Sequence, residues 1–285
     1  MTESANGGGG LYAISDLHIS YPENREYVEN LQPDDPADWL IVAGDVAERF
    51  LDVAWALHTL RSKYAKVIWV PGNHELWTPK SDQVQSRGEQ RYRQLVELCR
   101  KLDVLTPEDP FPVWQGTSTD ADGGVVIAPL FVLYDYTFRP PGTNSKEEGL
   151  AAAARAGVMA TDEAMLHPDP HPSREQWCEE RVAESERRLA DRPEGLPTVL
   201  VNHFPLTEEP TRALRFPEFA QWCGTTRTAD WHKRFDAQVV VYGHLHIPRT
   251  THEDGVRFEE VSLGYPREWS RRGQAPKPRR ILPAS

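Results

Sequence analysis

Five short apolar segments recur along the chain, and each one ends in polar residues. They predict buried β-strands, because they are four or five residues long, rich in valine, isoleucine and leucine, and bounded by turn residues. Near-continuous apolar runs of this kind are typical of parallel strands whose two faces are both covered. The segments are residues 11–15, 39–43, 66–70, 197–201 and 239–242.

Apolar residues at helical spacing lie between several of these segments. Ala54, Leu57 and Leu60 predict a helix that covers the sheet, and His58 falls on its exposed side. A second amphipathic helix is predicted over residues 87–102. Strands that alternate with helices indicate an α/β fold built on a layered sheet.

Residues 130–196 differ in character from the rest of the chain. They contain polar loops and two helix candidates, at 150–156 and 176–189, but few large apolar residues. We therefore expect an insertion or cap within a single domain at 11–270 rather than a separate domain. Residues 1–10 are expected to be a flexible N-terminus and residues 271–285 a C-terminal tail. A hairpin is predicted to turn at Asp254-Gly255.

Composition narrows the class of protein. The 285 residues are 39% hydrophobic, which is enough for a full core, and no segment reaches the length of a membrane span, so we expect a cytoplasmic protein. Cys99, Cys178 and Cys223 are few and far apart, which excludes a disulfide framework and a cysteine-based zinc site. The net charge of −11 argues against nucleic acid as a partner.

Residues with metal-binding side chains follow the ends of the predicted strands. The carboxyl ends of parallel strands meet at one edge of a sheet, so we expect these side chains to lie close together. Any one of them alone would also fit a polar turn; the repetition of the pattern is what favours a metal site. The residues are Asp16, His18, Asp45, Asn73, His74, His203, His244 and His246.

The donor set indicates the kind of metal site. Carboxylates, imidazoles and one amide oxygen suit Mn or Fe, with Zn as the alternative. So many ligands exceed the needs of one ion, whereas two ions about 3.5–4 Å apart could share a carboxylate and activate a water for in-line attack at phosphorus. His167 and His171 also lie close together, but the prolines around them predict a loop that would not hold ligands rigidly.

In this order, the strand-end residues resemble the five motifs of the calcineurin-like metallophosphoesterases: Asp16-x-His18, Gly44-Asp45, Gly72-Asn73-His74-Glu75, His203 and Gly243-His244-x-His246. The resemblance implies a double β-sheet sandwich flanked by helices. It also implies one metal held by Asp16, His18, Asp45 and His246, and a second held by Asp45, Asn73, His203 and His244. Asp45 would bridge the two ions, and His74 would be the catalytic acid or the stabiliser of the transition state rather than a ligand.

At two places this sequence differs from the motifs of other subfamilies, which reduces the number of subfamilies that it can resemble. Val46-Ala47-Glu48 lacks the tyrosine ligand of purple acid phosphatases, and Phe204-Pro205 replaces the two glycines of protein Ser/Thr phosphatases. The chain is more similar to the actinobacterial phosphopantetheinyl hydrolases, at residues 201–206, 222–226, 243–251, 254–261 and 264–269. That similarity implies removal of 4'-phosphopantetheine from a holo-carrier protein. The alternatives are a phosphoesterase for a small nucleotide or metabolite, and a non-catalytic scaffold, which the complete ligand set disfavours.

An acidic carrier protein would need a basic surface on this acidic chain. Residues 205–285 contain 13 Lys and Arg against 10 Asp and Glu, which leaves a charge of −14 for residues 1–204. We expect the aromatic rings around Tyr134 to flank the pantetheine arm. The candidate docking residues are Arg212, Arg215, Arg227, Arg249, Arg267, Arg271 and Arg272.

Overall fold

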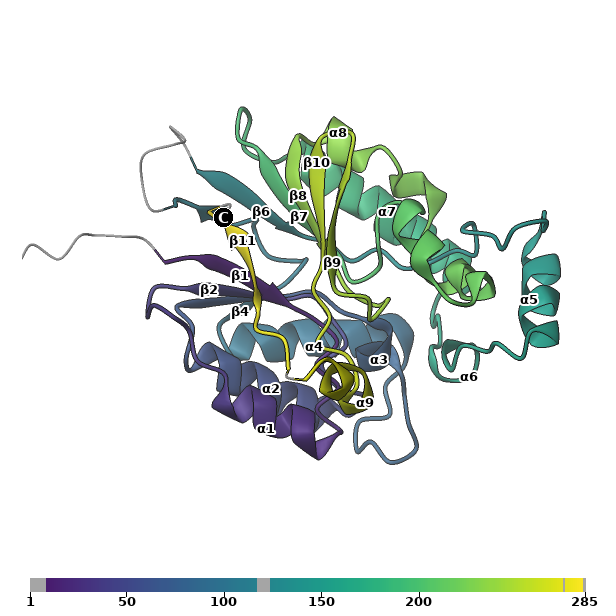
Figure 1. Cartoon of the computed structure of the whole chain (residues 1–285), viewed down its shortest axis with the longest axis horizontal. Helices are drawn as coiled ribbons and strands as arrows, with labels where there is room; N and C mark the ends of the chain where they lie inside the picture. The colour runs from purple at the N-terminus through teal and green to yellow at the C-terminus, as the bar shows by residue number, and fades with distance from the viewer. Residues whose placement is uncertain (1–8, 117–123, 274, 284–285) are drawn as a thin grey trace, which may run out of the picture.

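The computed structural model describes residues 9–116, 124–273 and 275–283. Two β-sheets are stacked face to face, and helices cover their outer faces (Figure 1). The first sheet has the strand order β11-β1-β2-β3-β4, and the second has the order β5-β6-β7-β8-β10-β9. The predicted double-sheet sandwich is therefore confirmed.

The first sheet is built mainly from the N-terminal strands. Its strands are β1 (Leu11–Ile14), β2 (Trp39–Val42), β3 (Lys66–Trp69), β4 (Val104–Leu105) and β11 (Arg279–Leu282). β1 to β4 are parallel, whereas β11 pairs antiparallel with β1. Strands β1, β2 and β3 consequently end side by side at one edge.

The second sheet collects the later strands. They are β5 (Val113–Trp114), β6 (Val125–Pro129), β7 (Thr198–Val201), β8 (Ala237–Tyr242), β9 (Arg249–Glu253) and β10 (Val256–Glu260). β6, β7, β8 and β10 are parallel, and β9 and β10 form the hairpin predicted at Asp254-Gly255.

Alternation along the strands divides the core into two layers. Leu11, Ile41 and Ile68 point between the sheets, where they pack against Val199 and Val239 of the second sheet. Their neighbours along each strand point the other way, into the layer beneath the helices. Because both faces of these strands are buried, their sequence reads as continuous apolar runs instead of a polar–apolar alternation.

Nine α-helices and four 3₁₀ helices surround the sheets in the described part of the chain. In Figure 1, α1, α2 and α4 lie against the first sheet and α7 and α8 against the second, while α5 and α6 project to one side. The α-helices are Pro22–Asn30, Phe50–Arg61, Asn73–Leu76, Gly88–Lys101, Lys146–Arg155, Asp162–Met165, Arg174–Ala190, Trp231–Arg234 and Pro266–Trp269, numbered α1 to α9. The 3₁₀ helices are Glu209–Ala213, Pro217–Trp222, Thr226–Thr228 and Ser270–Arg272, numbered η1 to η4.

The predicted insertion packs against the main core. Phe131, Trp177 and Leu189 belong to the same buried cluster as the helix-side residues of both sheets. The division into an N-terminus, one domain with an insertion, and a tail stays a prediction. Within the described residues, no helix is both long enough and apolar enough to cross a membrane.

Ordered contacts occur within both of the predicted chain ends. Residues 1–8 of the predicted flexible N-terminus lie outside the described residues, but Gly9 and Gly10 are buried, and the Gly10 N–H donates to Asp38 Oδ1 at 2.7 Å. The predicted tail contains β11, which pairs with β1. Only Ile281 and Leu282 of this strand are buried, so its edge position produces too short an apolar run to be recognised in the sequence.

Candidate metal centre

The strand ends of both sheets meet at one edge, and every predicted ligand follows one of them. Asp16 and His18 follow β1, Asp45 follows β2, and Asn73 begins α3 just after β3. From the second sheet, His203 follows β7, and His244 and His246 follow β8. Backbone hydrogen bonds join the two sheets here, from Ser15 N–H to Val261 O at 3.0 Å and from Leu263 N–H to Ser15 O at 2.9 Å.

Five of these residues have a left-handed backbone. The φ angles are 53° at Asp16, 41° at His18, 54° at Asp45, 70° at His244 and 55° at His246. This region is costly for residues other than glycine, and it persists at functional sites because the surrounding structure enforces it. Here it turns each chain sharply at the strand end, so that the side chains converge.

Two glycines make room for the carboxylates. A Cβ atom on Gly72 would lie 2.1 Å from Asp45 Oδ1, and one on Gly243 would lie 2.4 Å from Asp16 Oδ2. Both distances are far inside van der Waals contact, so any side chain would displace the carboxylate.

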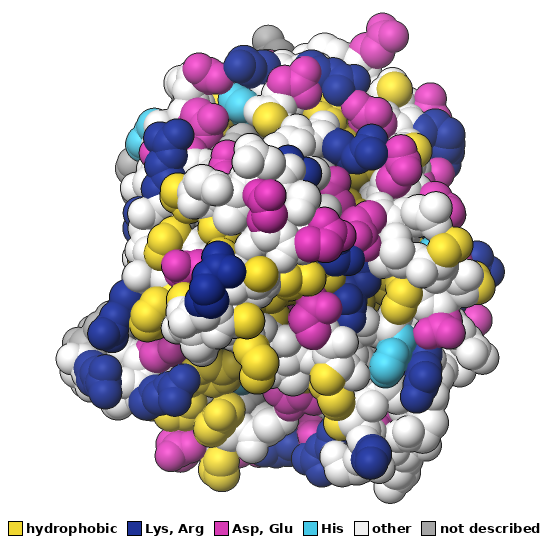
Figure 2. Space-filling view, turned by 90° about the vertical axis from the view of Figure 1, so that its right-hand side faces the viewer, with side chains coloured by type: hydrophobic (Ala, Val, Ile, Leu, Met, Phe, Trp, Pro, Cys, Tyr) yellow, Lys and Arg dark blue, Asp and Glu magenta, His cyan; other side chains and the backbone are white. Residues whose placement is uncertain are grey.

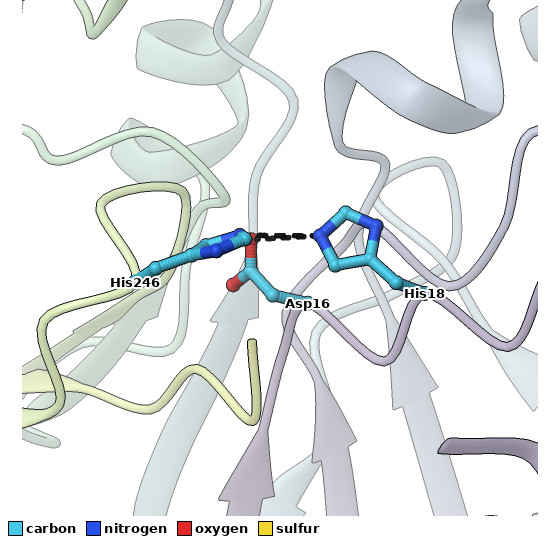
Figure 3. A group of neighbouring side chains, drawn as sticks. All are labelled: Asp16, His18 and His246. Carbon is cyan, nitrogen blue, oxygen red and sulfur yellow. Dashed lines mark hydrogen bonds and ion pairs between the residues drawn. The ribbon is translucent and has the colours of Figure 1, made fainter. Parts of the chain in front are cut away.

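Asp16, His18 and His246 form the first cluster of potential ligands. His246 Nε2 lies 3.0 Å from Asp16 Oδ1 and 3.1 Å from His18 Nε2. Figure 3 shows the two rings pointing toward one another across the Asp16 carboxylate. When two nitrogen atoms bind the same ion at about 2.1 Å each and the two metal–nitrogen bonds are perpendicular, the nitrogen atoms lie about 3 Å apart. The spacing between His246 Nε2 and His18 Nε2 therefore suits a shared ion.

Asp45, His203 and His244 form the second cluster. Each offers one ligand atom, and these atoms lie within 4.8 Å of one another. Asp45 Oδ2 is 3.4 Å from His203 Nε2. Asp45 also belongs to a group with His18 and His74, so its carboxylate lies between the two clusters. This is the position that a bridging ligand requires.

Unpartnered buried atoms test whether a metal fits this site. His203 Nε2, His244 Nε2 and Asn73 Oδ1 are buried and have no hydrogen-bond partner. Buried polar atoms are nearly always satisfied, and these three belong to predicted ligands of the same ion. The donor set and the orphaned atoms therefore fit a metal pair.

Partners on the opposite ring nitrogens orient two of the imidazoles. His246 Nδ1 lies 2.8 Å from Glu268 Oε2, and His203 Nδ1 lies 2.8 Å from the Ala43 carbonyl oxygen. A proton on Nδ1 donates to these acceptors and leaves the lone pair on Nε2 for a metal. These contacts are the usual supporting interactions of metal-binding histidines.

Glu75 fixes the backbone around Asp45. Its carboxylate accepts hydrogen bonds from the N–H groups of Asp45 at 3.0 Å, Val46 at 2.9 Å and Gly72 at 3.0 Å. Burial, together with the charge of Asp45, raises the pKa of Glu75 to about 7. One buried carboxyl group thus connects the ends of β2 and β3.

The imidazoles differ in their electrostatic environment. Burial lowers the pKa of His18 and of His244 to about 3, so both rings are neutral at pH 7, which is the form that binds metal. Burial also opposes the charge on His203, but the carboxylate of Asp45 outweighs it and raises the pKa of His203 to about 10. Asp16 and Glu268 likewise outweigh burial and raise the pKa of His246.

His74 lies at the mouth of the centre. Its Nδ1 is 2.9 Å from Glu48 Oε1, and its Nε2 is 3.8 Å from Asp45 Oδ2. Its ring stacks on Trp77 with the centroids 3.7 Å apart. One ligand atom from each of His74, His18 and Asp45 lies within 4.8 Å of the others, so His74 could also hold a metal. Its role as a catalytic group rather than a ligand therefore stays a prediction.

A cavity of about 310 Å³ opens over the metal centre. Polar ligands form its floor, and the apolar side chains of Met159, Leu214, Phe219 and Leu245 line its wall. Figure 2 shows the side of the molecule on which α5 lies, where hydrophobic side chains gather among charged ones. The prediction for Tyr134 is wrong, because its ring is 0% exposed and packs against Tyr136 and Phe204.

His58 and His171 lie outside the centre. His58 is exposed on α2. His171 is not among the described groups that could hold a metal; its ring nitrogens each lie 3.2 Å from a carboxylate, of Glu89 and of Glu180. The three cysteines are free and buried.

Four supporting carboxylates were not assigned a role from the sequence: Glu48, Glu75, Asp162 and Glu268. Glu75 lies inside the Gly-Asn-His-Glu motif, and Glu268 follows the aromatic Tyr265. Neighbouring residues in the sequence could therefore have identified both as site residues. Asp162 lies in α6 of the insertion and accepts a hydrogen bond from Asn73 Nδ2 at 2.9 Å. No pattern in the sequence pointed to that contact.

Comparison with known proteins identifies close relatives. The calcineurin-like phosphoesterase family matches residues 11–248. The [Acyl-carrier-protein] phosphodiesterase PptH of Mycobacterium tuberculosis is 57% identical over 273 residues, which cover 96% of this chain and 83% of that protein. The crystal structure of phosphopantetheinyl hydrolase (PptH) from Mycobacterium tuberculosis superposes with a TM-score of 0.94 at 55% identity, covering 99% of this chain and 98% of that one.

The family match spans all seven predicted ligands and His74, and the same fold recurs in a relative of more than half-identical sequence. The chain belongs to the calcineurin-like phosphoesterase family.

Proposed function

We propose that this protein is a metal-dependent phosphodiesterase that hydrolyses the phosphodiester of holo-acyl-carrier protein. The reaction would release 4'-phosphopantetheine and leave the apo-carrier protein. The observation that carries the proposal is the 57% identity, over 96% of the chain, to an enzyme named as an acyl-carrier-protein phosphodiesterase. The complete set of ligands at the strand ends supports catalysis and argues against a scaffold.

The proposed metal pair would be held by seven residues. Asp16, His18, Asp45 and His246 would bind one ion, and Asp45, Asn73, His203 and His244 the other. We propose manganese, iron or both, with zinc as the alternative, because nitrogen and oxygen donors predominate. Such ions polarise the phosphoryl group and lower the pKa of bound water.

The proposed role of His74 follows from its position. Its Nδ1 is held by Glu48, which leaves Nε2 facing Asp45 and the cavity. Burial lowers the pKa of His74, but Asp45 and Glu48 outweigh that effect and raise it, which favours the protonated ring. A protonated imidazole there can donate to the leaving serine oxygen or to the charged phosphoryl oxygens.

The cavity suits a thin substrate arm. Its apolar wall could contact the pantetheine chain, while the carrier protein stays outside. Of the candidate arginines, Arg212 pairs with Glu209, and Arg227 pairs with Asp135 and Glu179. Arg215 is exposed over the Phe216 ring and has no carboxylate partner among the described residues. It is adjacent to Leu214 of the cavity wall, so we propose Arg215 as a docking residue for the acidic carrier protein.

Hydrolysis of a carrier protein is tested directly by intact-mass spectrometry. Incubating holo-acyl-carrier protein with the manganese-loaded enzyme should reduce its mass by that of 4'-phosphopantetheine less one water, because hydrolysis adds a water across the cleaved bond. The Asp45→Asn variant should be inactive because the bridging charge is lost. If the holo-carrier mass stays unchanged while a small phosphodiester is cleaved, the small-molecule alternative replaces this proposal. A metal-stripped enzyme with full activity would contradict metal dependence.

Metal binding should release protons. The pKa of His203 is raised to about 10, which favours its protonated ring at pH 7, and the pKa of His246 is raised in the same direction. A metal binds only the neutral rings, so uptake of Mn²⁺ should expel their protons, and affinity should increase as the pH rises. Calorimetry in buffers of different ionisation enthalpy measures this release, and a His203→Asn variant should release fewer protons. A binding heat independent of the buffer would contradict the expectation.

Removing the His74 ring should separate catalysis from metal binding. The His74→Ala variant should lose about 10²–10⁴-fold in kcat, the usual contribution of a general acid, while it keeps two ions per chain. Metal content and kcat are measured on the same sample, with His58→Ala on the exposed face of α2 as the control. A parallel loss of one ion would instead identify His74 as a ligand.

Charge reversal at Arg215 should weaken carrier-protein recognition only. The Arg215→Glu variant should raise KM for holo-carrier protein about fivefold, corresponding to a surface interaction of ~1 kcal/mol, and high salt should reduce the difference. Hydrolysis of a small phosphodiester should be unchanged. Arg280→Glu, an exposed arginine on β11, is the matched control. Equal effects of the two variants would exclude Arg215 as a docking residue.

A further inference from the structure

The side-chain amide of Asn73 must be held in one orientation by another group to act as a metal ligand. Only its Oδ1 atom can bind a cation, whereas rotation by 180° would present the NH₂ group, which can only donate hydrogen bonds. Asn73 Oδ1 is buried and unpartnered, and its residue lines the cavity over the metal centre. Whichever group binds Nδ2 therefore decides which atom faces the centre.

That group is the carboxylate of Asp162. Asn73 Nδ2 donates to Asp162 Oδ1 at 2.9 Å, and Trp77 Nε1 donates to the same oxygen at 2.7 Å. A carboxylate oxygen accepts hydrogen bonds, so it selects the nitrogen of the amide and rejects the oxygen. Asp162 is only 2% exposed, which keeps water from competing for this contact.

Other residues of the insertion hold Asp162 in place through its backbone. The Arg174 guanidinium, at the start of α7, donates to the carbonyl oxygen of Asp162 at 2.7 Å and to that of Glu163 at 3.1 Å. Arg174 also binds the Glu163 carboxylate at 3.1 Å and the Tyr136 hydroxyl at 2.9 Å. The position of the carboxylate thus depends on α6, α7 and the segment around Tyr136 together.

We propose that Asp162 is a positioning residue that fixes Asn73 with its oxygen toward the second metal. The insertion, in addition to lining the cavity with residues such as Met159, then completes one of the two metal positions. The inference rests on the metal assignment of the proposed function, but it does not depend on which phosphodiester is the substrate.

Metal affinity tests the inference. The Asp162→Leu variant keeps a side chain of similar size but has no acceptor, so Mn²⁺ should bind one site about 10- to 100-fold more weakly, the usual loss for a removed supporting partner. The other site should be unchanged. Asp162→Asn retains an oxygen acceptor and should keep most of the affinity. Calorimetry of the metal-free full chain, with metal analysis after dialysis, measures both sites.

Two controls separate positioning from loss of folding. Asp38 is another buried carboxylate, 1% exposed, which binds backbone N–H groups at the opposite end of β2. Asp38→Ala should therefore destabilise the protein without changing the affinity of either metal site. If Asp162 acts through Asn73, the Asn73→Ala/Asp162→Leu double variant should bind no more weakly than Asn73→Ala alone.

Different results would contradict the role of Asp162 and the proposed carrier-protein substrate. Wild-type affinity at both sites in folded Asp162→Leu, or additive losses in the double variant, would overturn the role of Asp162. If Asp162→Leu does not fold, Asp162→Ala provides the same measurement with a smaller side chain that also lacks an acceptor, and weakened binding at one site is again expected. A wild-type enzyme that leaves holo-carrier protein intact would refute the proposed substrate while leaving these metal affinities unaffected.

Discussion

Mutual repulsion among buried carboxylates is the constraint on which this site depends. Asp16, Asp45, Glu75 and Glu260 are all at most 2% exposed and share the edge where the two sheets end. Burial and the charge of Asp16 raise the pKa of Glu260 to about 7, as burial and Asp45 do for Glu75. Like charges in a buried site require compensation by protons, hydrogen bonds or cations. Backbone N–H groups supply part of it. Protonated imidazoles supply more in the metal-free protein, and the proposed metal ions would replace those protons on binding.

Most of the central fold could be predicted because its strands are buried on both faces. Residues such as Ile41 and Val199 face the other sheet, while Leu40 and Leu200 face helices, so each strand shows an unbroken apolar run. The weaker elements could not be predicted. β4 and β5 are two residues long, and β11 gains its stability from pairing with β1 rather than from a pattern of its own.

The predicted ligands were recognisable because each follows a strand, whereas the residues that orient them depend on contacts distant in sequence. Asn73 and Asp162 are 89 positions apart, and a short helix in a polar insertion has no periodicity that indicates its partner. Tyr134 illustrates the opposite error. An aromatic residue in an insertion resembles a substrate-binding group, but composition does not show which side of a loop faces the core, and this ring lies fully inside it.

The sharing of the centre between two sheets determines when it can form during synthesis. His246 and Asp16 are in contact across 230 positions, and the Glu268 carboxylate that orients His246 follows later still. Contacts of such long sequence separation form late, after extensive loop closure. An emerging chain therefore carries the ligands of the first sheet without their partners. The metal centre can be assembled only once nearly the whole domain has left the ribosome.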